Sequence, residues 1–148
     1  MKSIKKNSGF TLIEILVVIG IIAILASVVI VALNPARQFA QARNTQRWSN
    51  VNTILNAVGQ RMADSRGLWN STCGTATVTL PSTATAIGST TGNIDLSPCI
   101  VPTYVSTMVV DPSTGTAGDT GYTIVQDANG RITIGATGEL SENISVTR

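Results

Sequence analysis

The chain has 148 residues, of which 43% are hydrophobic but only 4% aromatic, so it has room for one domain of ordinary size with a thin core. It contains two cysteines and no histidine, and it has neither a nucleophile-elbow motif nor a glycine-rich phosphate loop. This composition argues against most zinc sites and against acid–base or phosphoryl chemistry, so we expect a protein that is not an enzyme and needs no cofactor.

The formal net charge of +2 is unevenly distributed along the chain. Lys2, Lys5 and Lys6 are the only lysines, and without them seven basic residues face eight acidic ones. Residues 35–66 carry a net charge of +4, whereas residues 67–148 carry a net charge of −4. These charges are either ordinary solvated surfaces or a means by which the basic and acidic segments attract neighbouring copies in an assembly.

Residues 10–33 form an apolar segment whose one charged side chain is Glu14. As a helix the segment would be about 36 Å long, which is enough to cross the hydrocarbon core of a bilayer. It is too long for the apolar core of an ordinary secretory signal, so we expect a membrane helix. Three lysines precede it, and the first basic residue after it is Arg37, which favours a cytoplasmic N-terminus with the rest of the chain on the far side of the membrane.

Glu14 is the informative residue of this helix, because a carboxylate in hydrocarbon normally needs a partner. No basic residue lies within a helical turn or two of it. Glu14 either reaches the membrane surface or receives its partner from outside the helix, from another subunit or from an amino group made by cutting the chain upstream. A cut after Gly9 would place a free amine at Phe10, four residues before Glu14.

The run KKNSGFTLIE at residues 5–14 resembles the class III leader and cleavage motif of type IV pilins and type II secretion pseudopilins. The likeness lies in a short basic leader, Gly9 before the cut, Phe10 after it, and Glu14 as the fifth residue of the mature chain. The resemblance implies that residues 1–9 are removed by a prepilin peptidase, which also methylates the Phe10 amine. It further implies that Glu14 pairs with the Phe10 amine of an adjacent subunit during assembly.

An amphipathic helix is expected over residues 34–66, after an interruption at Asn34-Pro35, because proline removes a backbone donor and crowds the preceding turn. The resemblance adds Gly20 as a second place for a kink. The apolar stripe that should pack on the rest of the domain consists of Trp48, Val51, Leu55, Val58 and Met62, with Ile54 beside it. Arg43, Arg47 and Arg61 are expected on other faces. Without an interruption, residues 10–64 would form one helix about 80 Å long.

An α+β, pilin-like fold is expected, in which the second half of the helix packs on an antiparallel sheet of three or four strands. Cys73 and Cys99 should form a disulfide within a connecting loop at residues 67–103, if this part lies outside the cytoplasm. The sheet is expected in residues 104–148, with a hairpin around Asp127–Gly130. The strand candidates are residues 77–80, 104–110, 122–126, 131–134 and 144–146.

The order of turns and strands after Asp111 is similar to the C-terminal half of major pseudopilins and simple bacterial pilins. In major pseudopilins a loop between late strands binds calcium, and Asp111, Asp119 and Asp127 are the candidates here. They lie eight residues apart without the alternating oxygens of a known calcium loop. Turn and cap roles are therefore favoured, and no metal is expected.

The resemblance implies a structural subunit of a type IV pilus-like filament that serves adhesion, motility or DNA uptake. The alternatives are a major pseudopilin of a type II secretion system and a membrane-anchored binding module that never polymerises. The expected partners are other copies of the chain, minor pilins, the prepilin peptidase, a platform protein, an assembly ATPase and membrane lipid. The subunit would wait in the inner membrane and then enter a periplasmic or extracellular filament. Direct nucleic-acid binding by the arginines of residues 35–66 is not expected, because a filament would bury them.

Overall fold

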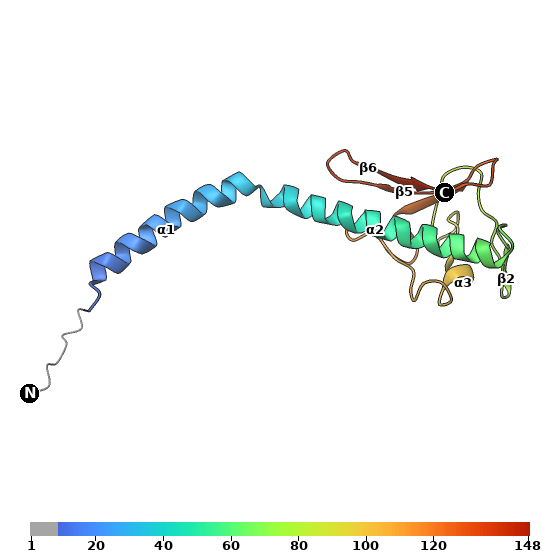
Figure 1. Cartoon of the computed structure of the whole chain (residues 1–148), viewed down its shortest axis with the longest axis horizontal. Helices are drawn as coiled ribbons and strands as arrows, with labels where there is room; N and C mark the ends of the chain where they lie inside the picture. Colours follow the sequence, from blue (N-terminus) through green and yellow to red (C-terminus); the bar gives the residue numbers. More distant parts are fainter. Residues whose placement is uncertain (1–8) are drawn as a thin grey trace, which may run out of the picture. The chain divides into compact units, whose positions relative to one another are not determined.

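The computed structural model describes residues 9–148, so Lys2, Lys5 and Lys6 of the expected leader lie outside the described residues (Figure 1). The chain divides into two compact units, one ending at Gln38 and the other spanning Phe39–Arg148. We call the second unit the head. A long N-terminal helical region followed by antiparallel sheets of two and four strands confirms the expected α+β, pilin-like architecture.

Helix α1 (Leu12–Leu33) is apolar around its whole circumference, and none of its residues is buried. Among the described residues it is the one helix long and apolar enough to cross a membrane by length and composition. A soluble domain would cover such a surface with its own core. Because no described residue covers α1, lipid or other protein is the expected partner of its surface.

The helical region is interrupted at Asn34, which ends α1 in the left-handed conformation with φ 42°. Pro35 is the first residue of α2 (Pro35–Asp64), a position where its missing N–H group has no helical partner to lose. The Asn34 side chain accepts a hydrogen bond from the Arg37 N–H group at 3.4 Å and so caps α2. Gly20, the second expected kink, causes no break in α1, since glycine adds flexibility without removing a hydrogen bond.

The core of the head lies between one face of α2 and a four-stranded antiparallel sheet (Figure 1). The sheet has the order β3 (Thr85–Ala86), β4 (Tyr122–Gln126), β5 (Ile132–Thr137) and β6 (Asn143–Thr147). Alternate strand residues face α2, and the register pairs Ile124 with Ile134 and Ala136 with Ile144. The buried core side chains that α2 and these strands contribute are Val51, Ile54, Leu55, Ala57, Val58, Tyr122, Ile124, Ile132, Ile134 and Ile144.

The segment between α2 and the sheet contains a short hairpin of β1 (Thr72–Cys73) and β2 (Ala76–Thr77), followed by α3 (Ser97–Ile100). A disulfide joins Cys73 to Cys99 and so ties the hairpin to α3. Arg61, expected on a face away from the core, reaches over this segment. Its guanidinium donates to the carbonyl oxygens of Thr72 at 2.8 Å and Cys99 at 3.0 Å, and lies over the Trp69 ring.

The prediction of a strand at residues 104–110 is wrong, because the structure has turns and irregular chain there. Tyr104 and Val105 donate their N–H groups to the carbonyl oxygen of Ile100, and the apolar side chains of the segment pack against the core. The fourth strand of the sheet is β3, which lies in the segment expected to be a connecting loop. The apolar pattern of residues 104–110 therefore reflected burial and not strand pairing. The strand expected at residues 77–80 is limited to Thr77, the last residue of β2.

Candidate functional site: the N-terminal motif and a polar clamp

Gly9 and Phe10 precede α1 and are exposed to solvent, with 80% of the Phe10 surface accessible. A Cβ atom added at Gly9 would meet no heavy atom within 4 Å, and Gly9 does not have the left-handed backbone that favours glycine. The packing and backbone of this chain therefore do not require glycine at position 9. A requirement for it would have to come from a molecule that recognises the segment.

Glu14 is engaged by Thr11 in a reciprocal capping box at the start of α1. The carboxylate of Glu14 accepts hydrogen bonds from the backbone N–H group of Thr11 at 2.8 Å and from its hydroxyl at 2.7 Å. The N–H group of Glu14 donates to the Thr11 hydroxyl oxygen at 3.3 Å. Both donors are neutral, and no ion pair to Glu14 is present in residues 9–148, so its charge stays uncompensated within this described part of the chain.

The sequence reasoning missed this local partner, although the spacing Thr-x-x-Glu before an apolar run is a recognised signal for a capping box. The two hydrogen bonds from Thr11 partly stabilise the carboxylate, but they do not neutralise its charge. A carboxylate that keeps its charge in a medium of low dielectric constant is still attracted to a cation.

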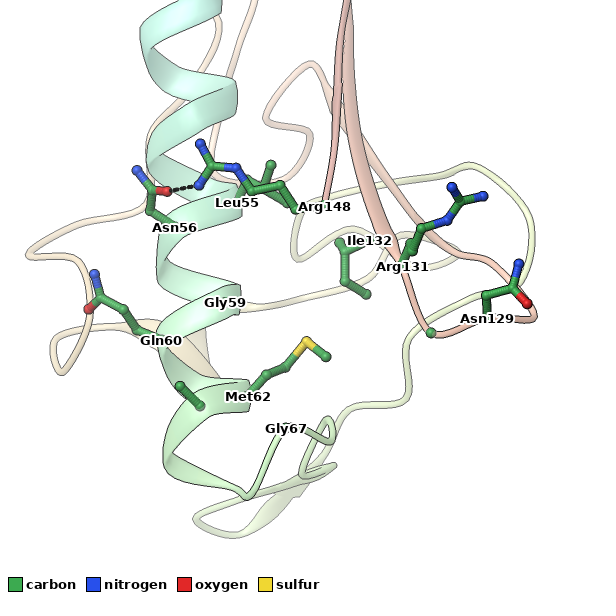
Figure 2. Close-up of a pocket in the computed structure, with 12 residues that line it drawn as sticks. Leu55, Asn56, Gly59, Gln60, Met62, Gly67, Asn129, Arg131, Ile132 and Arg148 are labelled. Carbon is green, nitrogen blue, oxygen red and sulfur yellow. Dashed lines mark hydrogen bonds between the residues drawn. The ribbon is translucent and has the colours of Figure 1, made fainter.

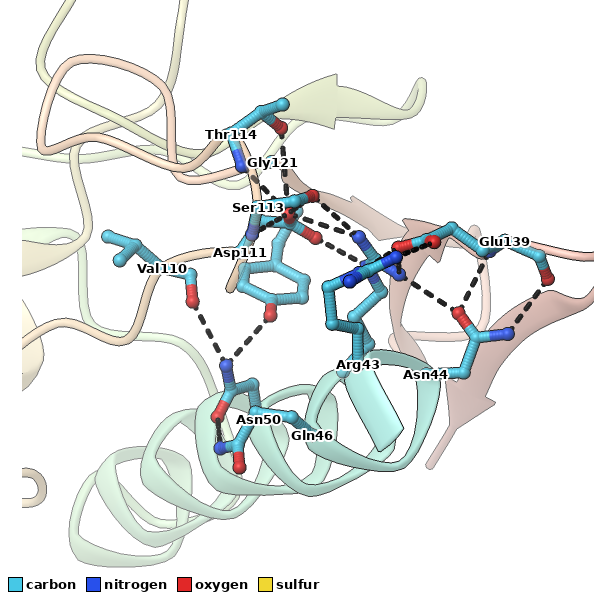
Figure 3. A network of polar contacts seen from close by, with 12 residues as sticks. Arg43, Asn44, Gln46, Asn50, Val110, Asp111, Ser113, Thr114, Gly121 and Glu139 are labelled. Carbon is cyan, nitrogen blue, oxygen red and sulfur yellow. Dashed lines mark hydrogen bonds and ion pairs between the residues drawn. The ribbon is translucent and has the colours of Figure 1, made fainter. Parts of the chain in front are cut away.

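A polar network, which we call the clamp, joins α2 to two loops of the head (Figure 3). It consists of Arg43, Asn44, Arg47, Asp111, Glu139 and Glu142. The Arg47 side chain is its centre and is only 4% exposed. Its guanidinium forms a two-pronged contact with the Asp111 carboxylate and donates to Glu139 at 2.9 Å and to the Ser113 hydroxyl at 2.8 Å.

The other half of the clamp holds the loop between β5 and β6. The side-chain amide of Asn44 bonds both backbone groups of Glu139: it accepts from the N–H group and donates to the carbonyl oxygen, each at 2.8 Å. Asn44 and the Trp48 indole also donate to the Glu142 carboxylate, each at 2.7 Å. Arg43 forms a two-pronged ion pair with Glu139. The loop is thus bound to α2 through both backbone and side chains.

The clamp corrects the expectation that Arg47 lies away from the buried face of α2. The buried face continues with helical spacing from apolar to polar residues, as Ala40, Asn44, Arg47, Val51, Ile54 and Val58. Arg43 and Arg47 form ion pairs with acidic residues of the same chain, so this part of the charge asymmetry acts within the subunit. The periodicity was visible in the sequence, but the carboxylates that satisfy Arg47 are 64 and 92 residues away.

The electrostatics of the clamp keep the carboxylates of Asp111 and Glu139 ionised. Hydrogen bonds from Arg43 and then Arg47 lower the pKa of Glu139 to about 2. Burial opposes ionisation of Asp111, but hydrogen bonds from Arg47 and Ser113 outweigh it and hold its pKa well below the usual range. The same contacts, led by the hydrogen bond to Asp111, raise the pKa of Arg47. All these groups are therefore charged and paired near neutral pH.

The three calcium candidates are not brought together by the fold. Asp111 belongs to the clamp, Asp119 accepts from the Gly121 N–H group at 3.0 Å, and Asp127 closes the hairpin turn through Arg131 and the Asn129 N–H group. These are the turn and cap roles that the sequence favoured. In residues 9–148 no group of three or more His, Cys, Asp or Glu residues is placed to hold a metal ion.

Residues 4–30 match the family described as the prokaryotic N-terminal methylation motif. No curated protein and no solved structure matched the chain. The motif, together with the α+β architecture, supports assignment of the chain to the type IV pilin and pseudopilin family as a precursor. The motif implies processing by a prepilin peptidase and assembly into pilus-type filaments, and with α1 it is consistent with a single-pass membrane anchor.

Replacing Arg47 by alanine should destabilise the head by about 3 kcal/mol, because Asp111 would remain buried without its counter-charge. Arg131→Ala is the matched control, since it breaks an ion pair whose arginine is 63% exposed and should change stability by roughly 0–1 kcal/mol. The measurement is denaturant unfolding of the full chain in detergent micelles, followed by circular dichroism. Equal losses for the two variants would contradict the central role of Arg47.

The pH dependence of stability should report the pKa of Glu139. This pKa lies below its ordinary value of 4.5, so the contribution of Glu139 is fully present above pH 4.5 and is lost as the pH falls towards 2. We expect the free energy of unfolding to fall in this window, and Glu139→Gln to flatten the fall while lowering stability at pH 7. An unchanged pH profile in Glu139→Gln would show that the ion pair with Arg43 and Arg47 contributes nothing.

Proposed function

We propose that the chain is the membrane-anchored precursor of a structural subunit of a type IV pilus-like filament, polymerised through α1. The observation that carries the proposal is that α1, an unburied apolar helix with one carboxylate that has no ion pair among the described residues, lies largely within the matched methylation motif. Lipid would cover α1 before assembly and the α1 helices of other copies afterwards. The lysines of residues 1–9 support a cytoplasmic N-terminus before assembly.

Within this proposal, the Phe10 amine released by cleavage supplies the positive charge for Glu14 of an adjacent subunit. The capping box explains how Glu14 is tolerated before assembly, since two local donors partly replace its hydration. Cleavage after Gly9 leaves the Thr11 donors in place, so the amine adds a charged partner without requiring the cap to break. Pairing in the interior of a filament would be selective for subunits in the correct register.

The choice between a pilus and a secretion pseudopilus rests on the head. Asp111, one of the three candidates for a pseudopilin-like calcium site, is committed to the buried Arg47, which favours the pilus. We therefore propose a pilus for adhesion, motility or DNA uptake, with a major pseudopilin as the alternative. Its partners would be minor pilins, the prepilin peptidase, a platform protein and an assembly ATPase, and neighbouring genes for these would distinguish the two machines.

Processing is tested by the intact mass of the protein recovered from filaments. We expect a chain that begins at Phe10 and carries one added methyl group. Gly9→Val should keep residues 1–9 attached and leave the subunit in the membrane, although Gly9 has open space around it and the fold should be unaffected. A filament mass that begins at Met1 would contradict the proposed processing.

The role of the Glu14 charge is separated from its role as a cap by Glu14→Gln. Glutamine can also complete a capping box, so α1 should form and insert, but filaments should be lost or sharply reduced because the charge is absent. Thr11→Ala is the complementary control, because it removes the cap at a cost of about 1 kcal/mol to the helix and keeps the carboxylate. Electron microscopy and sheared-filament yield measure the result. Normal filaments from Glu14→Gln would refute the charge pairing.

A further inference from the structure

The loop between β5 and β6, residues 138–142, presents an exposed leucine in a conformation that leucine rarely adopts. Leu140 has φ 57° and Ser141 has φ 62°, both in the left-handed region, and Leu140 is 53% exposed. Glycine or asparagine would suit this backbone better, and the exposed side chain adds little to the core. Folding of the single chain therefore does not explain a leucine at this position, and strained exposed residues often belong to contact surfaces.

The clamp holds this loop in one conformation, because Glu139 and Glu142 are both bound to Asn44. The Glu142 carboxylate has only neutral donors, Asn44 and Trp48, and no ion pair to it is present within residues 9–148. The loop thus offers a preorganised apolar side chain next to an uncompensated negative charge. Preorganisation reduces the entropy lost when such a surface binds.

A groove of about 600 Å³ lies at the other end of the head, between the C-terminal part of α2 and the β4–β5 hairpin (Figure 2). Leu55, Met62 and Ile132 contribute its apolar lining. Gly59 leaves space in it, since a Cβ atom there would meet no heavy atom within 4 Å. Arg148 lies at the groove, where its guanidinium donates to the Asn56 amide oxygen and to no carboxylate in the described part of the chain.

We propose that the β5–β6 loop of one copy of this chain docks in this groove of the next copy, with Leu140 beside Gly59 and Glu142 facing Arg148. The occupant is a second copy because this chain itself carries the complementary surface, an apolar side chain beside an unpaired carboxylate. The inference rests on the proposed function, since it assigns a contact between heads within the filament. The leucine would gain the burial that it lacks in the single subunit.

The two surfaces cannot meet within one chain. The loop is bound to α2 at Asn44 and the groove contains Gly59, which is about 22 Å further along the helix. A contact between different surfaces of identical subunits repeats from copy to copy and generates an open chain unless the rotation closes a ring. A contact between two sites this far apart along α2 would stack heads along the helix direction, as a filament with parallel helices requires.

The test is a site-specific cross-link in assembled filaments. A chain that carries both Leu140→Cys and Gly59→Cys should give a ladder of covalent multimers after mild oxidation, seen on a non-reducing gel. Filaments that mix the two single variants should give one heterodimer band, and neither single variant alone should give it. Filaments without these products, or a cross-link from position 59 to a different protein, would overturn the inference.

Two further variants separate loss of the contact from loss of folding. Leu140→Asn suits the left-handed backbone and Gly59→Gln fills open space on a helix, so both heads should stay at least as stable as the unmodified one. Both should nevertheless lower filament yield several-fold, whereas Ser49→Gln, an exposed α2 position outside the groove, should not. Unchanged yield from both variants would overturn the docking, while an unmodified chain that forms no filaments would instead refute the proposed function.

Discussion

The buried guanidinium of Arg47 is the interaction on which the arrangement of the head depends. It lies on the face of α2 that continues the apolar core, and it needs both Asp111 and Glu139 to be satisfied. Because a buried charge without partners is strongly unfavourable, α2, the loop after Asp111 and the β5–β6 loop have to meet in one arrangement. The clamp therefore specifies how the loops sit on the helix, while the Ile- and Val-rich core supplies most of the burial.

Carboxylates have different partners in the two units of the chain. In the head the carboxylates of Asp111 and Glu139 are paired with arginines of the same chain. Among the described residues, the carboxylate of Glu14 in α1 has only the neutral donors of Thr11, and the apolar surface around it is not buried. The described part of the chain thus neutralises Arg47 within the head but leaves Glu14 without an ionic partner. This division suits a protein that folds its head before it joins an assembly.

Prediction from the sequence succeeded where a local signal was sufficient. The β4–β5 hairpin has a run of turn residues between two alternating strands, and the break at Asn34-Pro35 follows from the missing proline N–H group. The prediction of a strand at residues 104–110 was wrong because apolar residues can be buried without pairing to a neighbouring strand. The strand β3 was missed because its two residues, one threonine and one alanine, are too few to form a recognisable pattern. Arg47 was predicted on the wrong face of α2 because the carboxylates that make its burial favourable are distant in sequence.

The sequence by itself determined that this protein has a membrane-length apolar helix, an N-terminal methylation motif that overlaps it and a carboxylate within it, since these depend on composition and on local spacing. Tertiary structure alone decided which charges are neutralised inside the chain and which are left for other molecules. Asp111 and Glu139 form ion pairs with Arg47, whereas Glu142 and Arg148 have no ionic partners among the described residues. The reason is that pairing depends on distance in space, and chain segments 60 or more residues apart meet only when the core has formed.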